Sequence, residues 1–376
     1  MKRLKWCKPF RVDVLIFDSL GVRYLKAGLP KQVLFTVLSF RDQVPVYFSL
    51  QLLVTWVKVA RKYKLGVSQA YMLALIDSFH PKVVLSFADL HSALGFYQLY
   101  RRDALVIAIQ NAIRYPEEFS PLVRAPHYFA IGNTAKRTFD VQGIPFQTCI
   151  PAGSLALGIY CSRNTVTRKQ GKLVFISSYR VVFERPSVKG ESESYTQAQA
   201  RAHEIAFNHT LRYAEESDSA LTVIAKGKVR YAGEHFAEEK SYFDRLANGR
   251  EYTLSSTVKD TYNSYQQALT AEFIFSLDST LAYEGFSIGA RILLCWGVDE
   301  YLSRRYQNFA KYLPRAALLD SADYDEFSTK VNFLRGLNNE SYDELTKGCR
   351  SEYVACLDEY PVHERIKREI TTRLRQ

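Results

Sequence analysis

Short apolar runs alternate with helix-length segments through almost the whole chain, and this alternation constrains the fold most. In the first half, the strand-like runs are residues 12–18, 82–87, 104–110, 127–132 and 146–153. In the second half, they are residues 172–179, 221–228, 251–256, 272–278 and 291–296. Helices are expected between them, most clearly at 44–64, 68–79, 195–217 and 236–248. Strands alternating with helices are typical of parallel sheets with crossover connections, so the fold class is α/β.

The runs form two series, which predicts two Rossmann-like domains in a chain of 376 residues. The polar stretch at 161–172 lacks apolar periodicity and is the expected linker. The predicted domains are therefore residues 1–160 and 173–345, followed by basic helices at 346–376. The last helix is expected to cross back onto the first domain.

The charge balance indicates an anionic partner, because 50 Lys and Arg oppose 39 Asp and Glu. Basic residues concentrate at both ends, in residues 1–11 and 363–375, which favours an anionic membrane surface over nucleic acid. Nucleic-acid binding is disfavoured since no aromatic single-strand platform accompanies the basic residues. A solvated polar face remains the alternative for these charges.

The expected location is the cytoplasm, peripherally on the inner face of the membrane. No cleavable signal peptide is visible, and the longest apolar stretch, residues 44–60, is interrupted by Gln51 and Lys58. The six cysteines form no CxxC pair and are expected to be buried thiols in a reducing compartment.

Common cofactor and metal motifs are missing from the sequence. It contains no GxGxxG after the first strand, no GxxxxGK[ST], no GxSxG and no HExxH. The expectation is a metal-independent mechanism without a resident cofactor, in which a nucleotide-bearing molecule is a substrate.

Polar residues at the strand ends of the second half form the first candidate site. Ligands of open α/β sheets bind at the carboxyl ends of the strands. A helix beginning after Asp278 would offer free N–H groups, together with two hydroxyls, to a phosphate. Glu284 would accept hydrogen bonds from ribose, and Gly285 would let the backbone approach the ligand. The alternative is that Asp278 and Ser279 only cap the helix. The candidate set is Ser178, Arg180, Lys226, Lys228, Asp278, Ser279, Thr280, Glu284 and Gly285.

Strand ends of the first half supply a second set, expected to face the same cleft. Asp89 and His91 follow one strand, Gln110 and Asn111 end the next, and Asp18 ends the first. These are residue types suited to acid–base chemistry and to holding hydroxyl groups. A partly buried structural histidine is the alternative for His91.

Eight segments in order resemble bacterial surface-carbohydrate biosynthesis proteins with the GT-B glycosyltransferase architecture. The group is similar to retaining transferases that add Kdo-type sugars from CMP-activated donors to capsule or lipopolysaccharide. The resemblance spans roughly residues 12–345 and rests on these segments: "VDVLIFDSLGVRYL", "VLFTVLSFRDQ", "HPKVVLSFAD", "IAIQNAIR", "FAIGN", "PAGSL", "FISSYR" and "SLDSTLAYEGFSIGARILL".

The resemblance implies acceptor binding in the first domain and donor binding in the second. The chain departs from it where Gln110-Asn111-Ala112 replaces Gln-Asn-Gly and where Ser177-Ser178-Tyr179-Arg180 replaces Ser-Gln-Tyr-Arg. These departures leave acceptor and donor sugar open.

The leading hypothesis is a glycosyltransferase that moves a sugar from a nucleotide donor to a glycan or lipid-linked acceptor. Arg180 and Lys226 would stabilise the departing phosphate. Asp89 would be the acceptor-side base if the reaction inverts, whereas retention could use a carboxylate nucleophile that is not assigned. The alternatives are a nucleotide-sugar epimerase or hydrolase of the same fold, and a non-catalytic assembly protein.

Overall fold

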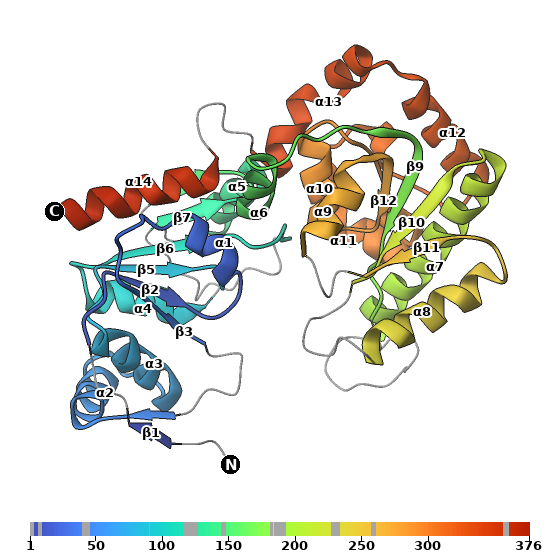
Figure 1. Cartoon of the computed structure of the whole chain (residues 1–376). Coiled ribbons are helices and arrows are strands. Elements are labelled where there is room, and N and C mark those ends of the chain that lie inside the picture. Colours follow the sequence, from blue (N-terminus) through green and yellow to red (C-terminus); the bar gives the residue numbers. More distant parts are fainter. Residues whose placement is uncertain are drawn as a thin grey trace. The chain divides into compact units, whose positions relative to one another are not determined.

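The computed structural model divides the chain into two compact units. Unit 1 comprises residues 1–162 and 355–376, and unit 2 comprises residues 163–354 (Figure 1). Residues 346–354, expected with the terminal helices, thus group with unit 2. The structure describes residues 4–6, 10–39, 46–89, 91–115, 127–143, 148–180, 183, 193–226, 234–256, 261–355 and 361–376.

Unit 1 is built on a parallel six-stranded sheet in the order β3-β2-β5-β6-β7-β8. Alternate residues of its central strands are buried on opposite faces, which is why these strands are apolar throughout. The strands are β2 (Val14–Phe17), β3 (Phe35–Leu38), β5 (Val83–Ser86), β6 (Leu105–Ile109), β7 (His127–Ala130) and β8 (Thr148–Pro151).

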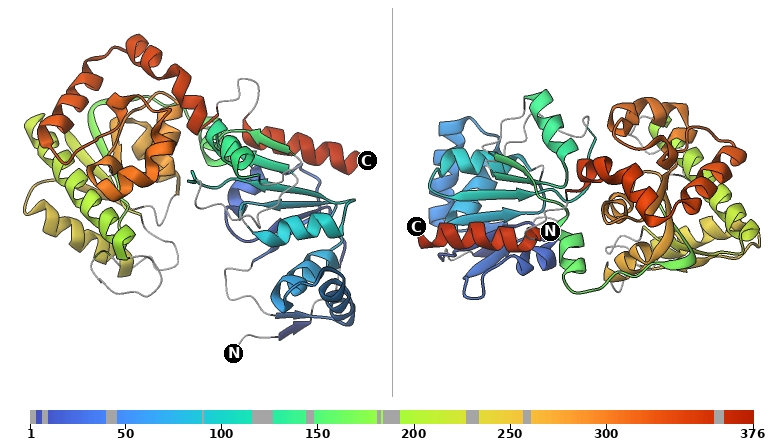
Figure 2. Two further views of the ribbon diagram at one scale, coloured as in Figure 1. Left: turned by 180° about the vertical axis from the view of Figure 1, so that it is seen from behind. Right: turned by 90° about the horizontal axis from the view of Figure 1, so that it is seen from above.

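Helices cover both faces of this sheet (Figure 2). One core joins Leu15, Val84 and Val106 to α3 (Val67–Ser78), α4 (Ser92–Tyr100) and α5 (Asn133–Gln142). A second group consists of α1 (Val22–Ala27), α6 (Leu155–Cys161) and α14 (Val362–Arg375), which contact one another. The predicted return of the last helix to the first domain is confirmed, because α14 belongs to unit 1.

A small strand pair and a helix complete unit 1. Strand β1 (Leu4–Trp6) pairs in parallel with β4 (Val46–Phe48), and α2 (Leu50–Tyr63) follows. The predicted helix at 44–64 therefore begins too early. Residues 46–48 are used in the strand pair, and the Ser49 side chain caps α2 by accepting a hydrogen bond from the Leu52 N–H.

Unit 2 contains a parallel five-stranded sheet in the order β11-β10-β9-β12-β13. Strand β9 lies at its centre and begins at Lys169, inside the stretch expected to be a linker. The strands are β9 (Lys169–Ile176), β10 (Ala220–Ile224), β11 (Thr253–Ser255), β12 (Ala271–Ser276) and β13 (Arg291–Leu294). The prediction of two Rossmann-like α/β domains with a helical C-terminus is confirmed.

Seven α-helices pack around the described part of this sheet. They are α7 (Glu193–Glu216), α8 (Glu234–Ala247), α9 (Thr261–Leu269), α10 (Thr280–Ser287), α11 (Glu300–Ala310), α12 (Tyr324–Gly336) and α13 (Asn339–Tyr353). Gly285 brings α10 close to β12: a Cβ there would lie 2.6 Å from Ile274 Cδ1. A larger residue at 285 would therefore meet the Ile274 side chain, so helix packing by itself is a sufficient reason for glycine at this position.

The structure bears on the cysteines and on the apolar length of the helices. Cys295 is buried, but Cys161 is exposed, so the prediction of buried thiols is wrong for Cys161, which is the last residue of α6. Of the helices in the described ranges, none combines the length and apolar character needed to span a membrane.

Candidate functional site

The carboxyl edge of the unit 2 sheet brings together three of the predicted residues. Strands β10, β9 and β12 are neighbours, and Lys226, Arg180 and Asp278 follow their last residues. Lys226 is exposed, while Arg180 and Asp278 are half-buried. Two cations and a carboxyl group therefore meet where a parallel sheet holds its ligands.

The Asp278 carboxyl lies in an environment that opposes its ionisation. Burial raises its pKa, while the charges of Lys226 and Arg180 and a hydrogen bond from Tyr306 lower it, and the net shift is upward. The Tyr306 hydroxyl donates to Asp278 Oδ2 at 3.3 Å. An aspartate with a raised pKa beside two cations is suited to proton exchange with a ligand.

Two tyrosines extend this group into α7 and α11. The Tyr195 and Tyr306 hydroxyls lie 3.0 Å apart, and Gln199 Nε2 donates to the Tyr195 hydroxyl at 2.9 Å. The guanidinium carbon of Arg305 lies 4.6 Å from the centre of the Tyr195 ring, and that of Arg180 lies 5.9 Å away. The strand-end pattern of the sequence does not mark the four residues Tyr195, Gln199, Arg305 and Tyr306, because they lie inside helices.

The start of α10 bears on the choice between helix capping and ligand binding. Ser279 occupies the N-cap position, but its side chain makes no capping hydrogen bond. Its backbone N–H donates instead to Ser276 Oγ at 3.1 Å. Capping therefore does not account for the Ser279 hydroxyl, and Thr280 is the first residue of the helix.

The other predicted residues of unit 2 have differing environments. Glu284 is buried, and both its carboxylate oxygens accept from the Tyr265 hydroxyl, at 3.0 and 2.8 Å. This contact gives Glu284 a role within the protein, and ribose binding by Glu284 stays a prediction. Ser178 is buried beside Arg180. Lys228 lies outside the described residues.

In unit 1, Asp89 is the centre of a buried polar cluster at the sheet's carboxyl edge. Arg114 Nη2 donates to Asp89 Oδ1 at 2.8 Å, and Arg114 Nε donates to Oδ2 at 3.2 Å. The Tyr128 hydroxyl also donates to Oδ2, at 2.6 Å. Arg114 additionally bonds Asn111 Oδ1, so the structure brings Asp89 and Asn111 together. The role of Asp89 as a base stays a prediction, and its contacts are those of a buried ion pair.

Gln110, Asp18 and His91 all make local contacts at the same edge. Gln110 Oε1 accepts from the Ile131 N–H at 2.8 Å, which ties β6 to β7. Asp18 adopts a left-handed φ of 76°, and its Oδ1 accepts from the Leu20 N–H. His91 is the N-cap of α4, because its Nδ1 accepts from the Ala93 N–H at 3.2 Å.

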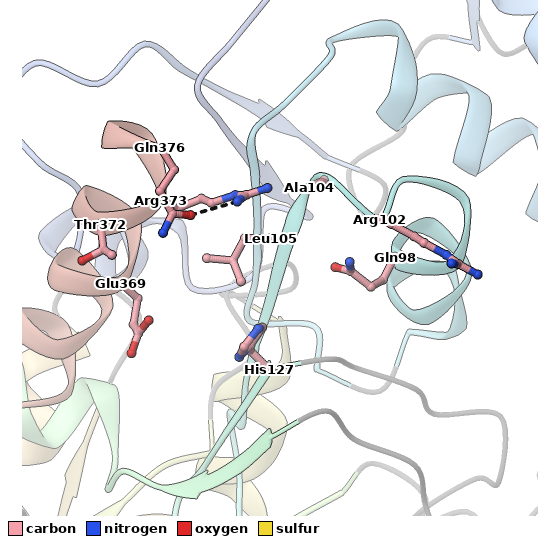
Figure 3. A pocket seen from close by; sticks show the side chains of 9 residues that line it. All are labelled: Gln98, Arg102, Ala104, Leu105, His127, Glu369, Thr372, Arg373 and Gln376. Atoms are coloured by element: carbon pink, nitrogen blue, oxygen red, sulfur yellow. Dashed lines mark hydrogen bonds between the residues drawn. The ribbon is translucent and has the colours of Figure 1, made fainter.

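A pocket lies at the opposite, amino-terminal edge of this sheet (Figure 3). Leu105 and His127 begin β6 and β7 there, and residues of α14 face them. His127 Nδ1 lies 2.7 Å from Thr148 Oγ1, and burial lowers the pKa of the imidazole. None of the predicted site residues lines this pocket. Within the described ranges, no group of three or more His, Cys, Asp or Glu side chains could hold a metal ion.

Solved structures share the fold of the whole chain at low sequence identity. A UDP co-structure of MnaA from S. aureus has a TM-score of 0.57 at 14% identity, covering 100% of this chain and 97% of that one. UDP-GlcNAc 2-epimerase from Neisseria meningitidis, bound to UDP-GlcNAc, has a TM-score of 0.54 at 11% identity, covering 96% and 98%. The wall teichoic acid polymerase TagF has a TM-score of 0.54 at 8% identity, covering 98% and 91%. At these identities the likeness shows the fold alone, which is GT-B.

The sequence itself matches one family. No curated protein matches the chain. A family model described as "putative O-antigen biosynthesis protein" matches residues 143–354, which is more than half of the chain. This protein therefore belongs to that O-antigen biosynthesis family.

Proposed function

We propose that the protein is a glycosyltransferase that moves a sugar from a nucleotide donor to a growing surface polysaccharide. Membership of the O-antigen biosynthesis family supports a role in the synthesis of surface carbohydrate. The wall teichoic acid polymerase TagF shares the GT-B fold. The observation that carries the proposal is the meeting of Lys226 and Arg180 with Asp278 beside the start of α10.

Transfer from a nucleotide sugar places new negative charge on the departing phosphate. The Arg180 guanidinium and the Lys226 ammonium would stabilise that charge, as would the positive end of the α10 helix dipole. The Ser279 hydroxyl, which the helix does not use as a cap, would donate to a phosphate oxygen. Burial raises the pKa of Asp278, so its carboxyl group would exchange a proton with the ligand. The Tyr306 hydroxyl, which donates to Asp278 Oδ2, would hold that carboxyl group in place.

The first experiment measures the affinity of the protein for different nucleotide-sugar donors. Calorimetric titration with CMP-, UDP- and CDP-linked sugars should reveal one preferred nucleotide, and the Kdo-type resemblance makes a CMP-linked sugar the first to test. Replacing Arg180 by Gln should weaken binding of that donor by about 1.5–3 kcal/mol, because a hydrogen bond to a charged group is lost.

Arg212→Gln is the matched control. Arg212 is an exposed arginine on α7 that pairs with Glu216, and its loss should leave donor affinity unchanged. Equal donor affinities of the wild type and the Arg180→Gln variant would show that the donor does not bind at the carboxyl ends of β9 and β12.

A nucleotide-sugar epimerase is the second candidate, because UDP-GlcNAc 2-epimerases share the fold. Incubation of the preferred donor without acceptor separates the two. A transferase should leave the donor intact until a glycan acceptor is added, whereas an epimerase would change the sugar while its nucleotide stays attached. Nuclear magnetic resonance of the anomeric proton distinguishes these outcomes.

A further inference from the structure

Helix α2 has two apolar faces, and only one of them packs against the rest of unit 1. Leu52 and Val59 are buried in the core. Leu50, Val54 and Val57 are exposed, and their spacing of four and three residues puts them on one outer face of the helix. Leu50 alone is 71% exposed. An ordinary surface helix would carry polar residues on that outer side.

The strand pair that precedes α2 adds two exposed aromatic residues. Trp6 and Phe48 are register partners in β1 and β4, with ring centres 5.8 Å apart. Trp6 is 66% exposed, and Phe48 lies two residues before Leu50. Together these side chains form the α2 surface, which consists of Trp6, Phe48, Leu50, Val54 and Val57.

Only basic charges border the α2 surface along the chain. Lys58, Arg61, Lys62 and Lys64 are exposed in the second half and at the end of α2. The sequence contains no Asp or Glu from residue 43 to residue 76. An exposed apolar stripe beside positive charge that its own segment does not offset favours a partner that is both apolar and anionic.

We propose that the α2 surface docks on an anionic lipid bilayer. Leu50, Val54 and Val57 would enter the boundary between headgroups and acyl chains, and Trp6 would lie at the interface, where its ring and N–H both find suitable surroundings. Lys58, Arg61 and Lys62 would extend to lipid phosphates while their methylene stems cover apolar surface.

A second copy of the chain fits this surface less well. A symmetric dimer through α2 would bring the same lysines and arginines together on both sides, with no carboxylate in the segment to offset them. The basic residues of α14, which the sequence also marks as a membrane contact, lack such a stripe, because Val362, Ile366 and Ile370 are buried in unit 1.

Vesicle flotation with the full chain tests the proposal. Wild-type protein should bind phosphatidylcholine vesicles containing phosphatidylglycerol, and should bind pure phosphatidylcholine vesicles far more weakly. The Lys58→Gln, Arg61→Gln, Lys62→Gln triple variant should lose affinity about fivefold for each charge removed, since each basic residue near the surface contributes about 1 kcal/mol. These side chains are exposed, so the denaturation midpoint should stay the same.

Matched variants separate the α2 surface from other surfaces. Val54→Gln with Val57→Gln should reduce binding at least tenfold, whereas Val141→Gln, at an 87% exposed site on α5, should not. A triple change of Lys367, Arg368 and Arg375 to Gln removes as many charges from α14 and should have the smaller effect. The reverse order of the two charge variants would overturn the proposal.

Tryptophan emission and oligomeric state provide two independent checks. Anionic vesicles should shift the emission to shorter wavelength, and Trp6→Phe should remove most of the shift, because Trp296 is buried and Trp56 packs against the core of unit 1. Sedimentation should find no dimer that depends on α2. A dimer that dissociates in the Val54, Val57 variant would assign the surface to a second copy and overturn the proposal.

Discussion

The imidazole of His203 is fully buried on α7 and makes a single hydrogen bond within the described part of the chain, at Nδ1. This bond joins Nδ1 to the Tyr242 hydroxyl at 3.1 Å, and the ring packs against Phe175 and Phe243. Burial, with a smaller contribution from the charge of Lys226, lowers its pKa to about 3. The folded protein therefore holds this histidine neutral, and the unfolded chain binds the proton more readily.

This difference predicts how stability depends on pH. Since the folded pKa lies below the ordinary value of 6.5, the contribution of His203 is complete above pH 6.5 and is lost as the pH falls towards 3. His203→Gln should reduce the fall in unfolding free energy by about 1 kcal/mol per pH unit between pH 6 and 5. Denaturant titrations at these pH values measure it. Identical slopes for the two proteins would mean that the folded state accepts the proton.

Residues at strand ends could be predicted from sequence, whereas residues on helices could not. Arg180, Lys226 and Asp278 follow apolar runs directly, and neighbouring parallel strands bring such positions together. Tyr195 and Tyr306 reach the same place from α7 and α11, where an aromatic residue looks like part of a helix core. The Arg114 partner of Asp89 was also missed, because an ion pair across 25 residues leaves no local pattern.

At the scale of the element, the packing of α10 on β12 positions the residues at the start of α10 that belong to the candidate site. Gly285→Ala should force either α10 or the buried Ile274 side chain to move, because the new Cβ would lie 2.6 Å from Ile274 Cδ1. Overpacking of this kind typically costs about 1–3 kcal/mol. Donor affinity should fall with it, since Ser279 and Thr280 begin the same helix.

Gly348→Ala is the control for this prediction. Gly348 lies inside α13, where an added Cβ meets nothing within 4 Å. Alanine there should stabilise the protein by up to about 1 kcal/mol through helix propensity. A gain in stability from both changes, measured by denaturation midpoints, would contradict the close packing of α10.

All ten predicted strands are present, and the elements that were missed are short or paired at a distance. β1 and β4 have three residues each and pair across some 40 positions of sequence. β3 is a four-residue edge strand in which only Leu38 is buried. The apolar runs therefore identify ten strands, including the edge strands β8, β11 and β13, but they do not reveal the β1–β4 pair or the edge strand β3.

At the scale of the whole molecule, the chain leaves unit 1 near residue 163 and returns at Ala355. The Ala355 N–H donates to the Ile131 carbonyl at 2.8 Å, and the Ala355 carbonyl oxygen would lie 2.4 Å from a Cβ at Gly153. Gly153 also has a left-handed φ of 87°. The return of the chain thus depends on a residue without a side chain.

Gly153→Ala should loosen α14 from unit 1. Gly143→Ala is the control, because Gly143 also has a positive φ, of 62°, but an added Cβ there meets nothing within 4 Å. Both changes should cost about 1–2 kcal/mol for backbone conformation, and Gly153→Ala should cost about 1–3 kcal/mol more for the collision. Hydrogen exchange of α14 measures the difference. Equal protection in both variants would mean that residue 355 moves aside freely.

The return of the chain to unit 1 also sets an order of events during protein synthesis. Residues 163–354 emerge from the ribosome as one uninterrupted unit, so unit 2 can complete its core while the chain is still growing. Unit 1 has its sheet much earlier, but Val362, Ile366 and Ile370 arrive only after the whole of unit 2. Until then, the surface of α1 and α6 that α14 covers stays uncovered, and we expect a chaperone to bind there. The domain that is begun first is therefore the one that is finished last.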